Sequence, residues 1–435
     1  MSADEENAED IGCICSDCGS VQIPNGSGSD CQEISSEISG YQVFGYGIGH
    51  FYNDLCASMW FTYFLLFLEK VIGIRSPVAG FIMLIGQATD AVSTALIGVL
   101  SDTVSAPLCF RHSGRRKSWH VFGTVLVTFS FTFIYNKCFV CLKSKTDWDL
   151  FAWYAPFVIV FQIGWAAVQI SHLSLLPELT SNESRRTTMN SVRYGGAVVA
   201  NLYIFGILFI LLHFDDSGSN IGPSDLNHFS TVAYTVIVLG LFTGIIFYIT
   251  TDEPSRIDRA GEIAQQHQYR ISVSLKSSIL RWMCRFQFYQ VGMLYMLCRL
   301  YINLSQIYFP FYIANLPNLS KKYVAVLPMV SFCSSLLVSS LIGIPSVNRR
   351  LSLEILALLG CSIGIINCVA MKLITNFPVY ITAVLLGAAQ ATLLITSLSV
   401  VAKLISHETV SDQVIIFSTS QLSLFVLIYL FIAFL

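Results

Sequence analysis

The feature that most constrains this chain is a series of long apolar segments that recurs from residue 41 to residue 435. Each segment can cross a hydrocarbon layer of about 30 Å at about 1.5 Å of helix rise per residue. Since 54% of the residues are hydrophobic and 12% are charged, a soluble fold would lack the charges to cover its surface. Open strands cannot satisfy their backbone in lipid, so we predict an all-α polytopic membrane protein. The eleven predicted spans are 41–68, 76–100, 119–142, 149–176, 191–213, 229–250, 287–314, 321–345, 352–372, 377–403 and 413–435.

The longest internal hydrophilic stretch separates six predicted spans from five. Six spans, a linker and further spans are typical of transporters built from two similar halves, so we predict two pseudo-symmetric bundles. The tail is acidic, rich in Ser and Gly and without Lys or Arg, which predicts disorder. The second half is one span short of six, and we interpret the chain as a variant or truncated form. The predicted domains are a cytosolic tail (1–40), a six-helix bundle (41–250), a cytosolic linker (251–286) and a five-helix bundle (287–435).

Lys and Arg are distributed unequally between the two faces of the predicted protein. The face with the GRRK loop (114–117) and the linker (251–286) carries most of them, and the face with Lys321 and Lys322 carries fewer. Positive residues favour the cytosolic side of a membrane. We therefore predict that the first face and the N-terminus are cytosolic and that the other face is lumenal or extracellular.

The first predicted span contains Asn53 and Asp54 near its middle. A charge at mid-span costs roughly 2.5–3.5 kcal/mol on insertion scales, so this carboxylate needs an explanation. Asp54 either lines a central aqueous cavity and contacts substrate, or it is a structural acid paired with a basic neighbour; we favour the first. Arg193 and Arg299, which also lie within predicted spans, are the available counter-charges.

The second predicted span carries another buried acid, Asp90, and ends near Asp102, about 18 Å further along the helix axis. The following loop contains Arg115 and Arg116. A carboxylate at a helix end beside an Arg-rich loop is typical of a latch that breaks when a gate opens. We therefore predict gating, in preference to substrate contact, for Asp102 and Arg115.

Motifs in the first half resemble the melibiose-permease type of sugar–cation symporter, a group of the major facilitator superfamily. This resemblance implies a major facilitator fold, with Asp54 in contact with substrate, Asp90 in a cation site and Arg193 lining the cavity. It also extends the predicted gate to Arg116, Glu178 and Arg185. The motifs are YGIGHFYND (46–54), TDAVSTALIGVLSD (89–102) and LLPELTSNESRR (175–186).

Two positions depart from that group's pattern. The second acid of the cation site corresponds here to Thr94, and the acid that helps to hold sugar hydroxyls corresponds to Gln169. The first departure weakens the case for sodium and the second weakens the case for a sugar. One acid facing one Arg suits a zwitterion better than a polyol.

A closer resemblance covers both halves up to about residue 410. The chain is similar there to the major facilitator superfamily domain-containing protein 12 subfamily, which implies transport of cysteine into lysosomes and melanosomes and a link to pigmentation. The matching motifs are GHFYNDLCASMWFTY (49–63), FQIGWAAVQISHLSLLPEL (161–179), FYQVGMLYMLCRLYINLSQIY (288–308) and LLGAAQATLLITSLS (385–399).

The residues themselves support a zwitterion clamp. We hypothesise that the substrate carboxylate pairs with Arg193 or Arg299, whose planar guanidinium can donate two hydrogen bonds, and that its ammonium pairs with Asp54. Arg299, Asn303 and Gln306 are spaced by four and three residues and so share one helical face. That face either points at the substrate or makes hydrogen bonds between helices.

The predicted coupling-ion set is Asp90, Thr94 and His172. An unperturbed histidine titrates near pH 6.5, so His172 could carry a proton, although a single helical histidine is more often a packing residue. The coupling ion is therefore left as a proton or a cation.

Cysteines do not define a metal site. CICSDC (Cys13, Cys15 and Cys18) has no matching second half, so we favour disorder over metal binding. KCFVC places Cys138 and Cys141 at the lumenal end of the third span, where a disulfide and two free thiols are equally compatible with the sequence.

The leading functional prediction is a carrier of a small zwitterionic thiol amino acid that works by alternating access in the lipid bilayer. One alternative is a sugar–cation symporter, and another is a truncated, non-transporting form that acts through a full-length partner. Without a hydrolytic triad, nucleotide loop or metal cluster in the sequence, we predict neither an enzyme nor a cofactor, and nothing in the charge pattern predicts nucleic-acid binding.

Overall fold

The computed structural model of the 435-residue chain describes most of the predicted spans. The predicted tail up to residue 38, most of the linker and the eleventh predicted span lie outside the described residues. Side chains are not described at 102–103, 183–184, 287 and 401–410. The described ranges are 39–103, 114–141, 146–180, 182–215, 220–253, 286–316, 319–344, 352–373 and 378–410.

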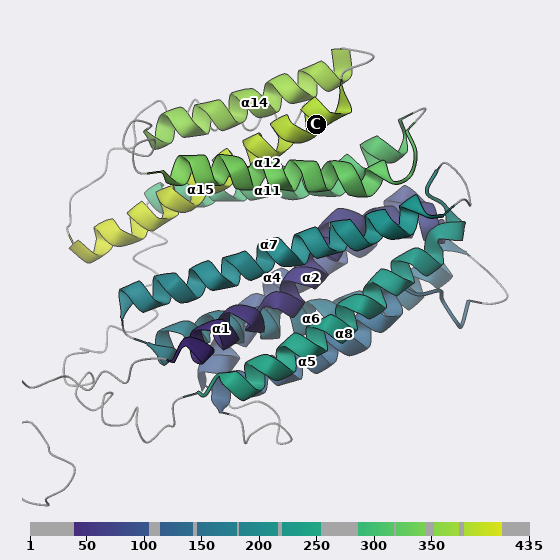
Figure 1. Cartoon of the computed structure of the whole chain (residues 1–435). Helices are drawn as coiled ribbons and strands as arrows, with labels where there is room; N and C mark the ends of the chain where they lie inside the picture. Colours follow the sequence, from purple (N-terminus) through teal and green to yellow (C-terminus); the bar gives the residue numbers. More distant parts are fainter. Residues whose placement is uncertain are drawn as a thin grey trace, which may run out of the picture. The chain divides into compact units, whose positions relative to one another are not determined.

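Within the described ranges, the first half forms six long helical segments (Figure 1). The first of them extends from Gly40 to Ile72 and includes several short elements. The helices after it are α4 (Ser76–Thr103), α5 (Arg115–Ile134), α6 (Asp147–Leu179), α7 (Glu183–His213) and α8 (Leu226–Thr250), with the 3-10 turn η4 (Pro223–Asp225) before α8.

Two π-helical turns interrupt the first span. It consists of α1 (Gly40–Gly49), α2 (Phe51–Ser58), η1 (Met59–Tyr63), α3 (Phe64–Leu66) and η2 (Phe67–Ile72). Gly73 ends it in the left-handed conformation, with φ of 87°, which glycine adopts without steric cost. Turns of π-helix inside α-helices are often found at functional positions.

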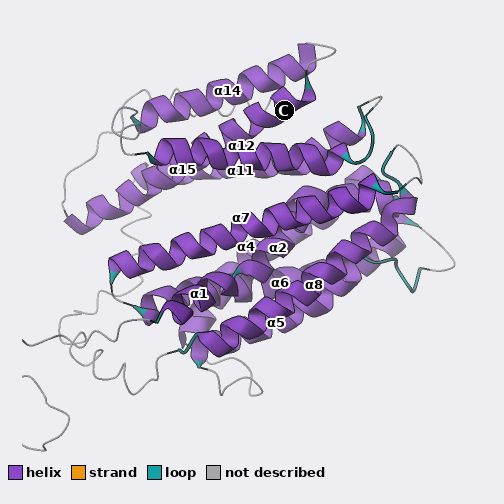
Figure 2. Ribbon diagram, viewed as in Figure 1, coloured by secondary structure: helices purple, strands orange, loops and turns teal. Residues whose placement is uncertain are grey.

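The second half contributes four described helices, α11 (Phe286–Ala314), α12 (Tyr323–Gly343), α14 (Leu353–Leu373) and α15 (Val379–Val410). They coincide closely with the predicted spans seven to ten. No strand occurs among the described residues (Figure 2), which confirms the all-α prediction. Eight of the described helical segments are long and apolar enough to cross a membrane. α5 and α11 are not among them; α5 begins with Arg115, Arg116 and Lys117 and is less apolar.

Small residues allow the helices of each bundle to approach closely. α5 crosses α6 where Gly123 faces Gly164, and a Cβ on Gly123 would lie 2.7 Å from the Gly164 carbonyl oxygen. In the second bundle α15 crosses α12 at Gly387, where a Cβ would clash with the carbonyl oxygen of Ser331. Close backbone approach at small residues is the usual way in which membrane helices pack, since lipid supplies no hydrophobic force between them.

The two bundles contact each other through α7 with α12 and through α11 with η1 and α3. The Tyr63 hydroxyl donates a hydrogen bond to the carbonyl oxygen of Val324 at 3.4 Å, and the rings of Phe205 and Phe332 are 6.2 Å apart. We call the end at which α7 ends and α12 begins the Lys321 end. The opposite end, at which α5 begins and α8 ends, is the Arg115 end.

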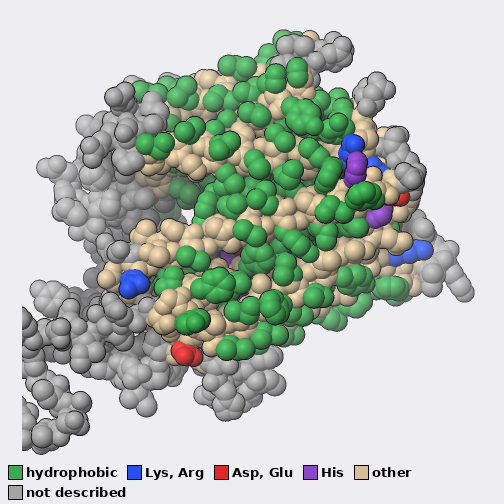
Figure 3. Space-filling view, in the orientation of Figure 1, with side chains coloured by type: hydrophobic (Ala, Val, Ile, Leu, Met, Phe, Trp, Pro, Cys, Tyr) green, Lys and Arg blue, Asp and Glu red, His purple; other side chains and the backbone are tan. Residues whose placement is uncertain are grey.

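The outer surface matches a membrane environment. Figure 3 shows hydrophobic side chains covering the middle of the helices, whereas charged and histidine side chains gather near their two ends. Large apolar residues on several helices are more than half exposed, for example Val99, Val238 and Ile366. Such exposure is costly in water but not in lipid.

Candidate functional site

The centre of the first span carries a short hydrogen-bonded network. His50 sits between α1 and α2, and its Nδ1 lies 2.9 Å from Oδ1 of Asp54. Its Nε2 lies 3.4 Å from Nδ2 of Asn53, which can only donate. The bonds therefore assign the histidine proton to Nδ1, where it is donated to the carboxylate. Oδ2 of Asp54 and Oδ1 of Asn53 are buried and have no partner among the described residues.

His172 of α6 lies beside this network. Its ring stacks on Tyr46 at 4.3 Å between centroids and lies 5.4 Å from the ring of His50. The side chain is fully buried, yet neither ring nitrogen has a hydrogen-bond partner within the described part of the chain. A buried polar group that is left without a partner costs about 1–3 kcal/mol, so the position is maintained at a cost.

Arg193 of α7 supplies the positive charge. It lies near enough to Tyr46 and His172 to interact with them electrostatically, and its buried Nε has no partner among the described residues. Three elements thus bring unpartnered donors and acceptors together. We call this set the first-bundle cluster; its members are Tyr46, His50, Asn53, Asp54, His172 and Arg193.

His120 of α5 borders the cluster but is fully bonded. Its Nδ1 lies 2.7 Å from the Tyr248 hydroxyl and its Nε2 lies 3.2 Å from the carbonyl oxygen of Gly49. Since a carbonyl only accepts, the proton is on Nε2, and Tyr248 donates to Nδ1. His120 is therefore a neutral linker between α1, α5 and α8, in contrast to the unpartnered His172.

The predicted residues of the second bundle do not join the cluster. Arg299, Asn303 and Gln306 are half-buried on α11, and no hydrogen bond or ion pair joins Arg299 to Asp54 among the described residues. Close to them, Nε2 of Gln390 donates to the Ser305 hydroxyl at 2.7 Å. Of the two arginines considered for the substrate carboxylate, Arg193 lies beside Tyr46 and His172 of the cluster, and its pairing with Asp54 through a substrate stays a prediction.

Three other predicted residues have local partners. The Thr94 hydroxyl donates to Oδ1 of Asp90 at 3.3 Å within α4. Oε1 of Gln169 accepts the indole N–H of Trp165 at 2.7 Å, so this carbonyl oxygen is already engaged. The structure gives neither Asp90 nor Thr94 a contact with the first-bundle cluster, and their role in coupling stays a prediction.

The predicted gate forms an ionic cluster at the Arg115 end. The guanidinium groups of Arg115 and Arg116 donate to Oε1 of Glu178 at 3.3 and 3.0 Å. Glu253, just after α8, accepts the backbone N–H groups of Arg115, Arg116 and Lys117, and so caps the start of α5. All of these residues belong to the first bundle.

Two further residues of the predicted gate, Asp102 and Arg185, keep their gating roles as predictions. The side chain of Asp102 is not described, so the Asp102–Arg115 latch stays a prediction; its neighbour Ser101 accepts from Nη1 of Arg116 at 2.8 Å. Arg185 lies in the first turn of α7, where its backbone N–H bonds to Oδ1 of Asn182 at 3.3 Å. Its role in gating also remains untested.

A second ionic cluster, which the sequence analysis missed, joins the bundles at the Lys321 end. Lys321, before α12, donates to Asp215 after α7 and to Asp225 of η4, the latter at 3.0 Å. His228 of α8 lies 2.9 Å from Asp215. Burial lowers the pKa of Lys321, but the hydrogen bonds and charges of Asp215 and Asp225 outweigh it, so the pKa is raised above its ordinary value.

Sequence signals for the missed residues were weak. His50 and His120 are single histidines in apolar spans, which usually pack. Asp215, Asp225 and Lys321 lie in polar loops, where charge is expected. Only the fold brings them together.

Comparison with known proteins identifies the family. Residues 45–413 match the family described as MFS/sugar transport protein. Major facilitator superfamily domain-containing protein 12 from Mus musculus is 38% identical over 84% of this chain and 78% of its own length. The human protein is 37% identical over 87% of this chain and 81% of its own length.

Weaker matches agree with these. The isoprimeverose transporter of Lactiplantibacillus pentosus is 25% identical over 55% of this chain and 46% of its own length. The xylose transporter XylE from E. coli, in a partially occluded inward-open conformation, covers 91% of this chain and 89% of its own, with a TM-score of 0.55 and 12% identity. The chain thus belongs to the MFS/sugar transport protein family and is a multi-pass membrane protein with the fold of a secondary transporter.

Proposed function

We propose that the chain moves a small zwitterionic amino acid, with cysteine as the favoured cargo, from the cytosol into a lysosome- or melanosome-type lumen by alternating access. The observation that carries this proposal is the set of buried, unpartnered atoms in the first-bundle cluster. Among the described residues, Oδ2 of Asp54 and Oδ1 of Asn53 are acceptors without a partner, and Nε of Arg193 is a donor without one.

An amino acid complements these atoms. Its ammonium group has three donors for the acceptors of Asp54 and Asn53, and its carboxylate can accept from the Arg193 guanidinium. A neutral polyol would satisfy the hydrogen bonds but would leave both charges uncompensated, which is costly away from water. The arrangement therefore favours a zwitterion over a sugar.

The Lys321 cluster supplies the gate for alternating access. Lys321 belongs to the second bundle and its two carboxylate partners to the first, so the bundles cannot separate at this end until these bonds break. Two features of the chain support a lumenal position for this end: the smaller number of Lys and Arg on that face and the positive residues opposite. In the state described, the gate on the Lys321 side is closed.

The cysteine cargo and the organelle rest on the likeness to the domain-containing protein 12 subfamily, which extends over most of the chain. One observation favours sugar as a second candidate, since a relative is an isoprimeverose transporter. Against it, Gln169 stands where that group has an acid, and its oxygen is bonded to Trp165.

His172 is the best-placed carrier of a coupling proton, because it stacks on Tyr46 within the cluster and neither of its nitrogens has a partner among the described residues. Cation coupling through Asp90 and Thr94 is the alternative. Uptake with and without a proton gradient, in the chain and in His172→Gln, separates these: proton coupling through His172 predicts that the variant loses its response to the gradient.

The test of the cargo is uptake of labelled cysteine and of a labelled disaccharide into vesicles that contain the purified chain. Asp54→Asn and Arg193→Gln should each reduce cysteine uptake by about ten- to a hundredfold, because each removes a hydrogen bond to a charged group worth about 1.5–3 kcal/mol. Asp252→Asn and Arg75→Gln are matched controls at exposed positions outside the cluster and should transport normally.

Disaccharide uptake that exceeds cysteine uptake would overturn the proposed cargo. Full cysteine uptake by both cluster variants would overturn the clamp. If no solute is transported unless a full-length relative is present, the chain is the non-transporting form.

A further inference from the structure

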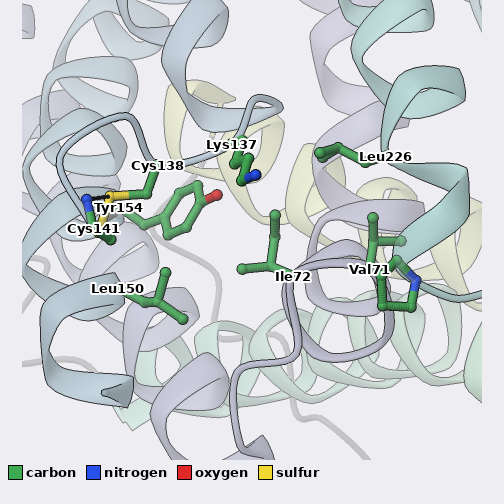
Figure 4. Close-up of a pocket in the computed structure, with 9 residues that line it drawn as sticks. Val71, Ile72, Lys137, Cys138, Cys141, Leu150, Tyr154 and Leu226 are labelled. Carbon is green, nitrogen blue, oxygen red and sulfur yellow. Dashed lines mark hydrogen bonds between the residues drawn. A yellow bond between two sulfur atoms is a disulfide. The ribbon is translucent and has the colours of Figure 1, made fainter. Parts of the chain in front are cut away.

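The segment between α5 and α6 contains a C-x-x-C sequence at the Lys321 end of the first bundle. Cys138 and Cys141 are joined by a disulfide, which decides between the two states that the sequence left open. The disulfide lies in the wall of a cavity of about 300 Å³, together with Lys137 (Figure 4). Ile72 at the end of the first span, Tyr154 of α6 and Leu226 of α8 contribute further walls.

The two sulfur atoms are not equivalent. Cys138 is 5% exposed, whereas Cys141 is half-buried. The backbone N–H of Cys141 donates to Sγ of Cys138 at 3.0 Å. That hydrogen bond stabilises negative charge on Cys138, and the Lys137 ammonium, in the same cavity, favours an anion as well.

A disulfide exchanges when a thiolate attacks one sulfur and the other leaves, and the better leaving group is the more stabilised thiolate. Here Cys141 is the more exposed residue of the pair and Cys138 is the stabilised leaving group. The cavity is large enough for a small organic molecule, and Lys137 gives it a partner for a carboxylate. A compact anionic thiol therefore complements both its size and its charge.

We propose that Cys138–Cys141 is a thiol–disulfide exchange site for a low-molecular-weight thiol carboxylate that enters this cavity. The thiolate RS⁻ attacks Sγ of Cys141, the Cys138–Cys141 bond breaks, and Cys138 leaves with the electron pair as a thiolate. A second RS⁻ attacks the sulfur of the first thiol in the mixed disulfide, which releases RSSR and the Cys141 thiolate. Two thiols are oxidised, the protein disulfide is reduced to a dithiol, and the two thiol protons pass to the solvent or to the protein thiolates.

This activity is separate from transport, because none of its residues belongs to the first-bundle cluster. The probe is L-cysteine, added to the purified full-length chain in lipid nanodiscs. After acid quenching and alkylation of free thiols, peptide mass spectrometry locates the cysteine adduct. We expect the adduct on Cys141 and the alkylated thiol on Cys138; no adduct and no dithiol, or adducts shared equally between the two, would overturn the proposal.

Two lysine variants test whether the charge of Lys137 promotes the exchange. Lys137→Gln should slow adduct formation by about three- to tenfold, because the leaving thiolate and the incoming carboxylate lose a positive neighbour. Lys322→Gln, a lysine at the same end outside the cavity, should react at the parent rate. Equal rates for the parent and Lys137→Gln would contradict the role of Lys137 and hence the anionic cavity.

The reverse reaction provides a second measurement. In Cys138→Ser the remaining Cys141 thiol should take up one half of added cystine, whereas in Cys141→Ser the buried Cys138 thiol should react at least tenfold more slowly. Asp54→Asn should exchange as fast as the parent chain even where its uptake is lost. Failure of exchange with intact uptake therefore rejects this inference alone, and failure of uptake with intact exchange rejects only the proposed function.

Discussion

The ionic clusters at the two ends of the molecule use the same chemistry but connect different parts. At the Arg115 end, Arg115 and Arg116 pair with Glu178, and every described partner lies in the first bundle. At the Lys321 end the lysine belongs to one bundle and its two carboxylates to the other. The first cluster can move as a unit with its bundle, whereas the second must break whenever the bundles separate.

The difference shows that a buried ion pair at a helix end does not by itself indicate a gate. Whether such a pair can act as a gate depends on whether its members belong to the same bundle or to different bundles. The pairs at the Arg115 end hold α5 against α6 and against the end of α8, and so stabilise one rigid body. Under the proposed alternating access, the Lys321 pairs stabilise only the conformation that is closed at the Lys321 end.

The largest expected effect comes from Lys321→Gln. The lysine side chain is 3% exposed and Asp225 is fully buried, so removing the cation takes the cationic partner from a buried carboxylate, at a cost of about 3–5 kcal/mol. That cost falls on the state that is closed at the Lys321 end and shifts its population by about a hundredfold or more. Single-molecule energy transfer between fluorophores on unnatural amino acids at Phe214 and Ile381 measures the separation of the bundles.

Lys322→Gln is the matched control, since Lys322 makes no ion pair among the described residues and lies 5.9 Å from the ring of Tyr323. It should leave the distance distribution unchanged. If Lys321→Gln also leaves the distribution unchanged, this ion cluster does not hold the bundles together.

Arg116→Gln should lower the stability of the protein without changing the separation of the bundles. Arg116 is 7% exposed and bonds to Glu178 and Ser101, so its loss should lower the free energy of unfolding by about 1.5–3 kcal/mol. Because Glu178 and Ser101 are both in the first bundle, the distance between bundles should not change. Thermal unfolding followed by tryptophan fluorescence reports the first quantity and energy transfer the second.

Arg75→Gln removes an arginine whose side chain is 75% exposed and should change the melting temperature little. A change in bundle separation for Arg116→Gln, with stability intact, would mean that the Arg115 end also carries an inter-bundle gate. That result would make the two ends equivalent.

Features that depend on neighbouring residues could be predicted from the sequence, whereas features that depend on distant partners could not. The spans were predictable because length and apolarity are local: 149–176 became Asp147–Leu179, extended at its start by a capping box between Thr146 and Asp149. The predicted start at residue 119 was late by four, because Glu253 caps α5 from a distant part of the sequence. No local pattern contains that partner.

Some residues of the candidate site could likewise be predicted from the sequence, and others could not. Asp54 and Arg193 were predictable, since a charge in an apolar span needs a reason wherever it occurs. His50 was missed although it stands four residues before Asp54, a spacing that brings two side chains together on one helical face. The Lys321 cluster was missed because charges in loops are common, and only the tertiary fold shows that Asp215, Asp225 and Lys321 lie together, with Asp225 and Lys321 buried.

His228→Gln should have a small effect on the Lys321 cluster. His228 bonds to Asp215 and not to Lys321, and its side chain is 22% exposed. Partly exposed pairs are worth about 0.2–1 kcal/mol, so the population of the closed state should change about twofold. An effect as large as that of Lys321→Gln would place His228, rather than the lysine, at the centre of the gate.

The smallest expected effect is that of alkaline pH on the closed state. The carboxylates of Asp215 and Asp225 raise the pKa of Lys321 above its ordinary value despite its burial, so its charge is retained until pH exceeds that raised value. A cation whose pKa is raised by pairing stabilises the paired state fully when the pH is below the pKa of the unpaired group. It loses this stabilisation only as the pH rises through the raised pKa. Energy transfer between positions 214 and 381 should therefore be flat from about pH 7.5 to pH 9.5. Opening within that range would show that the lysine loses its proton early, and that the carboxylates of the first bundle do not hold it as a cation.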